Sequence, residues 1–126
     1  GVHLVQGDAL TALPELAGTF DAVLSNPPYI PPANVPADPE AALHDPDMAL
    51  YGGGEDGMQM PSAIAARAFE LLAPGGLIME HDDTQEDAVA ELLARVGFEG
   101  CYPVRDLNNR PRHSVGYKPR PLEPLD

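Results

Sequence analysis

The fold is decided by the stretch Phe20-Asp21-Ala22-Val23-Leu24-Ser25-Asn26-Pro27-Pro28-Tyr29-Ile30. Its first half predicts a short apolar strand. The strand cannot continue past Pro27, because proline has no N–H for the ladder and holds φ near about −65°. The chain therefore leaves the sheet at a rigid corner that carries the amide of Asn26, backbone carbonyls of restricted direction and the ring of Tyr29. Such a corner can hold a small planar group that bears an NH2.

The composition narrows the class of protein. A chain of 126 residues, 44% hydrophobic, holds one domain at most. Its net charge of −13 and the lack of Lys or Arg before Arg67 argue against a nucleic-acid partner. We expect no membrane span, because no run of 18 residues is apolar. The single Cys101 favours a reduced, cytoplasmic setting, and its spacing from His44 and His113 predicts no metal site.

An acidic residue, Asp8, follows the predicted strand Val2–Gln6 and precedes a short helix or turn over 9–16. Acceptors at the carboxyl end of a strand sit where open α/β sheets bind ligands, so Asp8 could accept from a nucleoside, most simply from an adenine amino group. Asp8 could equally cap the helix that follows. The two roles are compatible, and both stay open.

The segment 30–58 is predicted to be irregular, because five prolines between Pro31 and Pro46 exclude a long helix. Loops of this length in a compact domain are usually functional or disordered. We interpret it as a substrate-facing loop, with a mobile surface loop as the alternative. Gly52-Gly53-Gly54 is not a phosphate loop, because no strand precedes it and no Lys with Ser or Thr follows.

The second half of the chain predicts alternating helices and strands. Apolar periodicity predicts a helix over 60–73 that stops at Pro74-Gly75-Gly76, and a helix over 86–96 that starts at a Thr84 cap and ends at Gly97. Strands are expected over 77–80, 99–104 and 113–117, the last two joined as a hairpin by the turn 106–109, and a flexible tail over 119–126. The chain is thus an α/β protein whose final strand is reversed.

Three motifs together resemble one enzyme family: Asn26-Pro27-Pro28-Tyr29-Ile30-Pro31, then Ala49-Leu50-Tyr51-Gly52-Gly53 with Asp56-Gly57, then Glu80-His81 with Gln85. The pattern is similar to the release factor glutamine methyltransferases, a class I (Rossmann-like) S-adenosylmethionine-dependent family. Asn-Pro-Pro-Tyr alone is shared with methyltransferases that act on adenine N6 in DNA and guanine N2 in RNA. The loop around Tyr51 narrows the choice.

The resemblance implies that residues 1–126 are part of a catalytic domain. They would supply the third to seventh strands of that fold with its terminal antiparallel hairpin, while the first two strands and the glycine-rich cofactor loop are missing. The implied reaction moves a methyl group from S-adenosylmethionine to the side-chain amide nitrogen of the glutamine in the Gly-Gly-Gln motif of peptide chain release factors, which modulates translation termination. The implied partner is that protein substrate, with no nucleic acid, membrane or metal. The piece by itself is expected to lack a competent cofactor site and to be inactive.

The resemblance also assigns roles around the corner. The Asn26 side-chain oxygen and the Pro27 carbonyl would accept the two N–H groups of the target amide, Pro28 would fix the geometry, and the Tyr29 ring would pack on the amide. The catalytic set is thus Asn26, Pro27 and Tyr29, and cofactor contacts fall on Asp8, Ala9 and Asn26.

Several alternatives remain at this stage. Glu80 is either a hydrogen-bond partner near the site or an acid at a loop entry, and His81 is interpreted as structural. The rival functions are an amino-group methyltransferase for RNA or DNA bases and a non-catalytic fragment of the fold.

Overall fold

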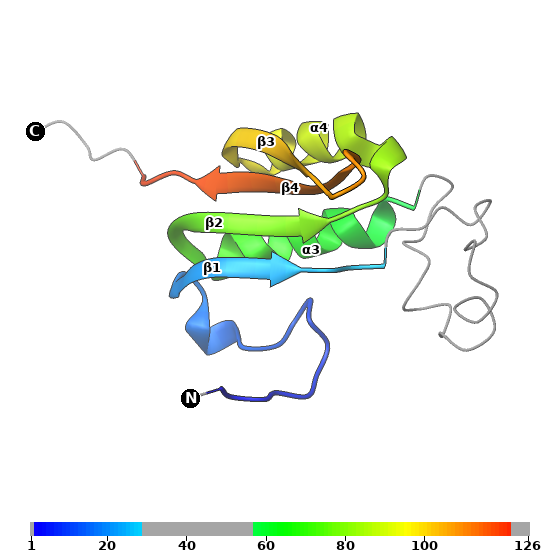
Figure 1. Cartoon of the computed structure of the whole chain (residues 1–126). Coiled ribbons are helices and arrows are strands. Elements are labelled where there is room, and N and C mark those ends of the chain that lie inside the picture. Colours follow the sequence, from blue (N-terminus) through cyan, green and yellow to red (C-terminus); the bar gives the residue numbers. More distant parts are fainter. Residues whose placement is uncertain (1, 29–56, 122–126) are drawn as a thin grey trace, which may run out of the picture.

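The computed structural model describes residues 2–28 and 57–121 (Figure 1). These residues form a mixed four-stranded sheet in the order β1-β2-β4-β3. Its strands are β1 (Phe20–Ser25), β2 (Leu72–Glu80), β3 (Glu99–Arg105) and β4 (Pro111–Lys118). β1 and β2 are parallel, whereas β4 is antiparallel to both β2 and β3. The predicted α/β class and the terminal hairpin are confirmed. The predictions for Tyr29, for the loop up to Asp56 and for residues 122–126 lie outside the described residues.

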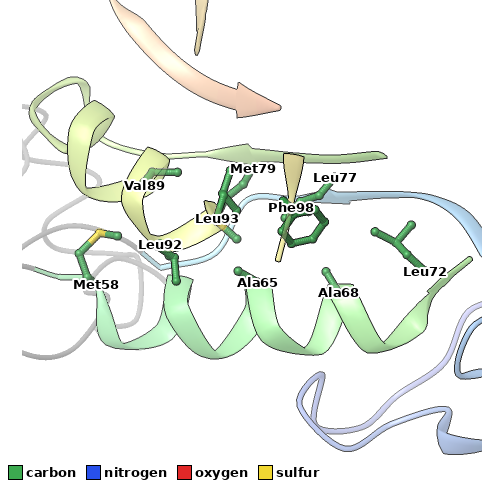
Figure 2. Close-up of a cluster of buried hydrophobic side chains, with 10 residues drawn as sticks. All are labelled: Met58, Ala65, Ala68, Leu72, Leu77, Met79, Val89, Leu92, Leu93 and Phe98. Carbon is green, nitrogen blue, oxygen red and sulfur yellow. The ribbon is translucent and has the colours of Figure 1, made fainter. Parts of the chain in front are cut away.

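Two α-helices of the described residues cover one face of the sheet. Helix α3 (Gln59–Leu71) packs on β1 and β2, and α4 (Glu86–Val96) packs on β3 and β4 and touches α3. Figure 2 shows the apolar side chains that meet between these layers. The buried cluster comprises Met58, Ala65, Ala68, Leu72, Leu77, Met79, Val89, Leu92, Leu93 and Phe98. The apolar stripes predicted from sequence therefore form the core.

The opposite face of the sheet carries a second row of apolar side chains. Leu24 of β1 pairs in register with Ile78 of β2, which pairs with Val115 of β4. Alternation along a strand sends these side chains away from the covered face, where Leu77 and Met79 point. Leu24 is 75% exposed and Ile78 39%. This face reaches the ends of β1 and β2, where the predicted corner lies.

The strand predicted over Val2–Gln6 is wrong. These residues form no strand, and Val2 and Leu4 are 93% and 97% exposed. A strand needs hydrogen-bonding neighbours. In the described residues no strand pairs with this segment, so it gains no ladder hydrogen bonds. Next along the chain, turns and a short 3-10 helix, η1 (Pro14–Leu16), stand where a short helix or turn was expected.

Helix α3 stops before Pro74-Gly75-Gly76, as predicted, but the prediction that these residues form the connection to the strand is wrong. Helix α3 ends at Leu71 and β2 begins at once at Leu72, so these residues lie inside the strand rather than in a turn. The register against β1 jumps from Phe20↔Leu72 to Ala22↔Gly76, which marks a bulge in β2. A Cβ on Gly75 would lie 2.0 Å from the backbone oxygen of Asp21. The glycine lets the two strands approach, and the sequence signal of a turn instead marks this close contact.

The helix bounds at α4 match the prediction, but its cap does not. Thr84 was expected to cap the helix, whereas Asp82 caps the preceding 3-10 turn, η2 (Asp83–Gln85), through a bond from the Thr84 N–H. The Gln85 side chain accepts in turn from the Asp82 N–H at 3.0 Å. This reciprocal pair is a capping box. Gly97 ends α4 with φ of 125° as predicted.

Candidate active site

The corner after β1 lies at the edge of a cavity of about 320 Å³. Because β1 and β2 are parallel, their carboxyl ends meet at one edge of the sheet. Asn26 is exposed there, Pro27 is buried and Pro28 is half-buried. The cavity is lined by Leu24, Ser25, Asn26, Ile78, Glu80 and His113. Asn26 therefore faces a hollow with apolar walls and with polar groups from two other strands.

Arg112 holds two carboxylates at the end of β2. It lies 3.8 Å from Glu80 and 3.8 Å from Asp82, and the three side chains are about three-quarters buried. Glu80 thus lines the cavity, and its ion pair with Arg112 holds its carboxylate in place. This placement favours a hydrogen-bonding role near the site over a loop-entry role.

His81 is fully buried directly behind Glu80. Its Nδ1 lies 2.8 Å from the Asp82 carbonyl oxygen, which can only accept, so Nδ1 carries the proton. Nε2 then accepts from the buried Ser114 hydroxyl at 2.8 Å. Burial lowers the pKa of His81 below its ordinary value, with smaller contributions from His113 and Arg112. The neutral imidazole joins the end of β2 to β4, which agrees with the structural role expected for it.

One of the predicted cofactor residues, Ala9, lines a second cavity. Ala9 lines a hollow of about 180 Å³ together with Val23, Leu24, Ser25, Ile64, Arg67, Ala68 and Leu71. The Asp8 carboxylate accepts from the Leu10 N–H at 2.9 Å, so it takes the turn-capping role that was one of its two predicted roles. Arg67 ties this segment to α3 by donating to the Ala12 carbonyl at 2.6 Å. The two cavities share Leu24 and Ser25, so the end of β1 separates them.

This second cavity by itself does not fit S-adenosylmethionine. Ligand pockets usually measure roughly 300–1,000 Å³, and this one is smaller. The described residues hold no glycine-rich loop that directly follows a strand and leads into a helix.

Other kinds of site find no support in the described residues. Over 2–28 and 57–121, no three His, Cys, Asp or Glu side chains gather as metal ligands. In the same ranges, no helix is long and apolar enough to cross a membrane.

The structure brings together only part of the predicted set. Asn26 lies in the larger cavity with Glu80, while Ala9 lies in the smaller one and Asp8 is engaged in its turn. Tyr29 is outside the described residues. Sequence reasoning missed His113 as a cavity residue. No local signal in the sequence could have found it, because the pairing Glu80↔His113 joins β4 to β2 and not to its hairpin partner β3.

The comparisons with known proteins point to one family. A release factor glutamine methyltransferase from Streptomyces coelicolor is 45% identical over 123 residues, which are 95% of this chain and 43% of that protein. The enzyme of the same name from Bifidobacterium longum is 43% identical over 114 residues, 88% of this chain and 39% of that protein. A 4-amino-L-phenylalanine/4-methylamino-L-phenylalanine methyltransferase from Streptomyces pristinaespiralis is 47% identical over 98 residues, 77% of this chain and 33% of that protein. No protein-family model matches. The matched part of the chain thus spans 33% to 43% of the length of the relatives named here.

Proposed function

From the homology of this chain to part of the release factor glutamine methyltransferases, we propose that it forms the acceptor side of such an enzyme. The substrate is the side-chain amide of a glutamine in a peptide chain release factor, and the product carries a methyl group on that nitrogen. The methyl donor is S-adenosylmethionine, and the location is cytoplasmic. The observation that carries the proposal is the position of Asn26, which lines a cavity of about 320 Å³ at the carboxyl ends of two parallel strands.

The chemistry demands acceptors arranged around a planar NH2. An amide nitrogen is a weak nucleophile, because its lone pair is delocalised into the carbonyl. Alignment and removal of water can therefore supply much of the rate increase. The Asn26 oxygen and the Pro27 carbonyl accept the two N–H groups and fix the plane of the amide. Pro28 keeps the corner rigid.

In the full enzyme the N–C bond would form as the methyl–sulfur bond of the donor breaks, and the donor would leave as a neutral thioether. The nitrogen would carry positive charge until it releases a proton to water. Acceptor oxygens stabilise this charge more than they stabilise the neutral amide. The Glu80 carboxylate lines the same cavity and adds a negative charge to it. The Tyr29 ring adds a cation–π contribution of about 1 kcal/mol in this proposal. The residues named here thus favour the transition state without a metal ion.

A second function is favoured by one of the relatives. The Streptomyces pristinaespiralis protein is named for an aromatic amine, 4-amino-L-phenylalanine, as its acceptor. An aromatic NH2 is also planar and would meet the same two acceptors. This acceptor is the second candidate for the present chain. Nucleic-acid bases are disfavoured by the net charge of −13.

A methyl-transfer assay with the full natural polypeptide tests the proposal. Radiolabelled S-adenosylmethionine is offered with a release factor, 4-aminophenylalanine, RNA and DNA side by side. We expect label on the release factor, and Asn26→Ala to lower turnover by about two orders of magnitude or more, as removal of one oxyanion-hole donor does elsewhere. Asn108→Ala, on the exposed hairpin turn, is the matched control and should stay near wild type. Near-normal methylation by Asn26→Ala would remove the assignment.

A further inference from the structure

Three polar side chains from neighbouring strands line the cavity in one row. Leu24 pairs with Ile78, and two residues further along β2 Glu80 pairs with His113 of β4. Because side chains on one face of a strand recur every second residue, Asn26, Glu80 and His113 continue the face that carries Leu24 and Ile78. All five residues line the same cavity. The hollow thus has an apolar floor and a polar rim.

The hydrogen-bonding capacities of this rim are unequal. Asn26 offers an amide oxygen that accepts and an NH2 that donates. Glu80, anchored 3.8 Å from Arg112, offers a carboxylate that only accepts. An imidazole ring carries an N–H in either tautomer, so His113 offers a donor. Ser25 pairs in register with the buried Met79, so its side chain leaves the strand on the covered face. His113 is therefore the residue of the polar rim whose ring N–H can donate to an oxygen of the ligand.

A primary carboxamide needs both acceptors and a donor around it. Its nitrogen presents two donors, and its carbonyl oxygen presents an acceptor that loses water when the side chain enters the cavity. Under the proposed function the two donors face Asn26 and Pro27. The remaining oxygen then needs a donor.

We infer that His113 donates to the carbonyl oxygen of the acceptor carboxamide and so selects an amide over an aromatic amine. His113 is a substrate-binding residue in this arrangement. An aromatic amine has no such oxygen, and it would leave the His113 N–H facing a ring. Sites built to hydrogen-bond a group discriminate strongly against an analogue that lacks it. The inference rests on the proposed function and names the chemical class that the site takes.

Binding to the full natural polypeptide gives the first test. Two peptides of identical sequence carry either glutamine or 4-aminophenylalanine at the central position, and calorimetry measures their dissociation constants. We expect His113→Phe to weaken the glutamine peptide about tenfold and to change the 4-aminophenylalanine peptide less than twofold. His113→Gln, which keeps an N–H donor, should restore at least half of the loss. The control His3→Phe makes the same exchange at an exposed position outside the cavity.

Two outcomes overturn the inference. One is an unchanged glutamine-peptide affinity in His113→Phe, and the other is an equal loss for both peptides. If His113→Phe fails to fold, the wild-type protein decides by NMR: the glutamine peptide should shift the ring nitrogen resonances of His113, and no shift overturns the inference.

The methyl-transfer assay separates this failure from failure of the proposed function. If the wild-type protein methylates a release factor and the His113→Phe variant binds the glutamine peptide normally, the proposed function stands and the inference about His113 is wrong. Wild-type protein that methylates only the aromatic amine overturns both.

Discussion

His81 makes the stability of this protein dependent on pH in a predictable direction. The side chain is fully buried, and burial lowers its pKa below the ordinary value. In the unfolded chain its pKa is about 6.5. Between the folded and unfolded pKa values, the unfolded state binds a proton that the folded state refuses. The free energy of unfolding therefore falls as the pH drops below about 6.5. Above that pH the contribution of the neutral His81 to stability is fully present.

The size of the effect follows from the unfolded-state titration. If the folded protein takes up no proton on His81 down to pH 5.5, the imidazole removes about 1.4 kcal/mol of stability between pH 7.5 and 5.5. This is an upper limit, because any proton uptake by the folded state reduces it. The loss is a noticeable fraction of the roughly 5–15 kcal/mol that stabilises a typical domain.

Urea unfolding at several pH values, with wild type and His81→Gln compared at each, isolates this contribution. The glutamine variant should be less stable by about 1 kcal/mol at pH 7.5, because the bond to Ser114 is disturbed. Below pH 6.5 the difference in stability should move by up to about 1.4 kcal/mol in favour of the variant, because glutamine cannot take up the proton. His3→Gln, at an exposed position, controls for unrelated titrations. A gap between wild type and His81→Gln that stays constant from pH 7.5 to 5.5 would refute the reasoning.

Three further perturbations test other parts of the molecule. Lys118→Met should lower the free energy of unfolding by about 2 kcal/mol, because the ammonium donates at 2.7 Å to both the Phe69 and Leu72 carbonyls at the end of α3. Thermal unfolding measures this loss, with Lys118→Arg as the comparison, and a change under about 0.5 kcal/mol would contradict the prediction. Gly75→Ala should lower the free energy of unfolding by several kcal/mol or abolish folding, because the new Cβ would meet the Asp21 oxygen. Gly18→Ala is the control: its Cβ would meet no atom within 4 Å, so despite some backbone strain it should cost far less in the same denaturation series. Calorimetry of the 126-residue chain with S-adenosylmethionine should show no tight binding, and a micromolar dissociation constant would mean that the smaller cavity suffices.

The elements that sequence predicted well are those with local signals. The apolar stripe over Ala88–Val96 and the glycine that follows it predicted both ends of α4. The turn around Asp106 was visible because Asp and Asn suit it, and the Asp106 carboxylate indeed accepts from the Asn108 and Arg110 N–H groups at 2.8 and 2.9 Å. These bonds lower the pKa of Asp106, and the bond from Arg110 has the larger effect. Local patterns of this kind need no knowledge of distant residues.

The features that sequence missed depend on residues far apart in the chain. Val2–Gln6 has the composition of a strand, but a strand exists only where another strand pairs with it. Pro74-Gly75-Gly76 has the composition of a turn, but the backbone of Asp21 lies against it. His113 looked isolated in the sequence, and the antiparallel pairing of β2 with β4 carries it to Glu80. In each case, the neighbour across the sheet decides the outcome.

Under the proposed function, the end of β1 would lie between the methyl donor and the acceptor amide. Leu24 and Ser25 line both cavities, so the strand end is a shared wall between the hollow with Ala9 and the hollow with Asn26. A methyl group moves only between atoms that nearly touch in line, so donor and acceptor must meet beside such a wall. Pro27 and Pro28 stop the ladder at this point, and a longer β1 would close the gap that the transfer needs. The proline corner therefore supports the proposed function through where it ends the strand as much as through the groups that it presents.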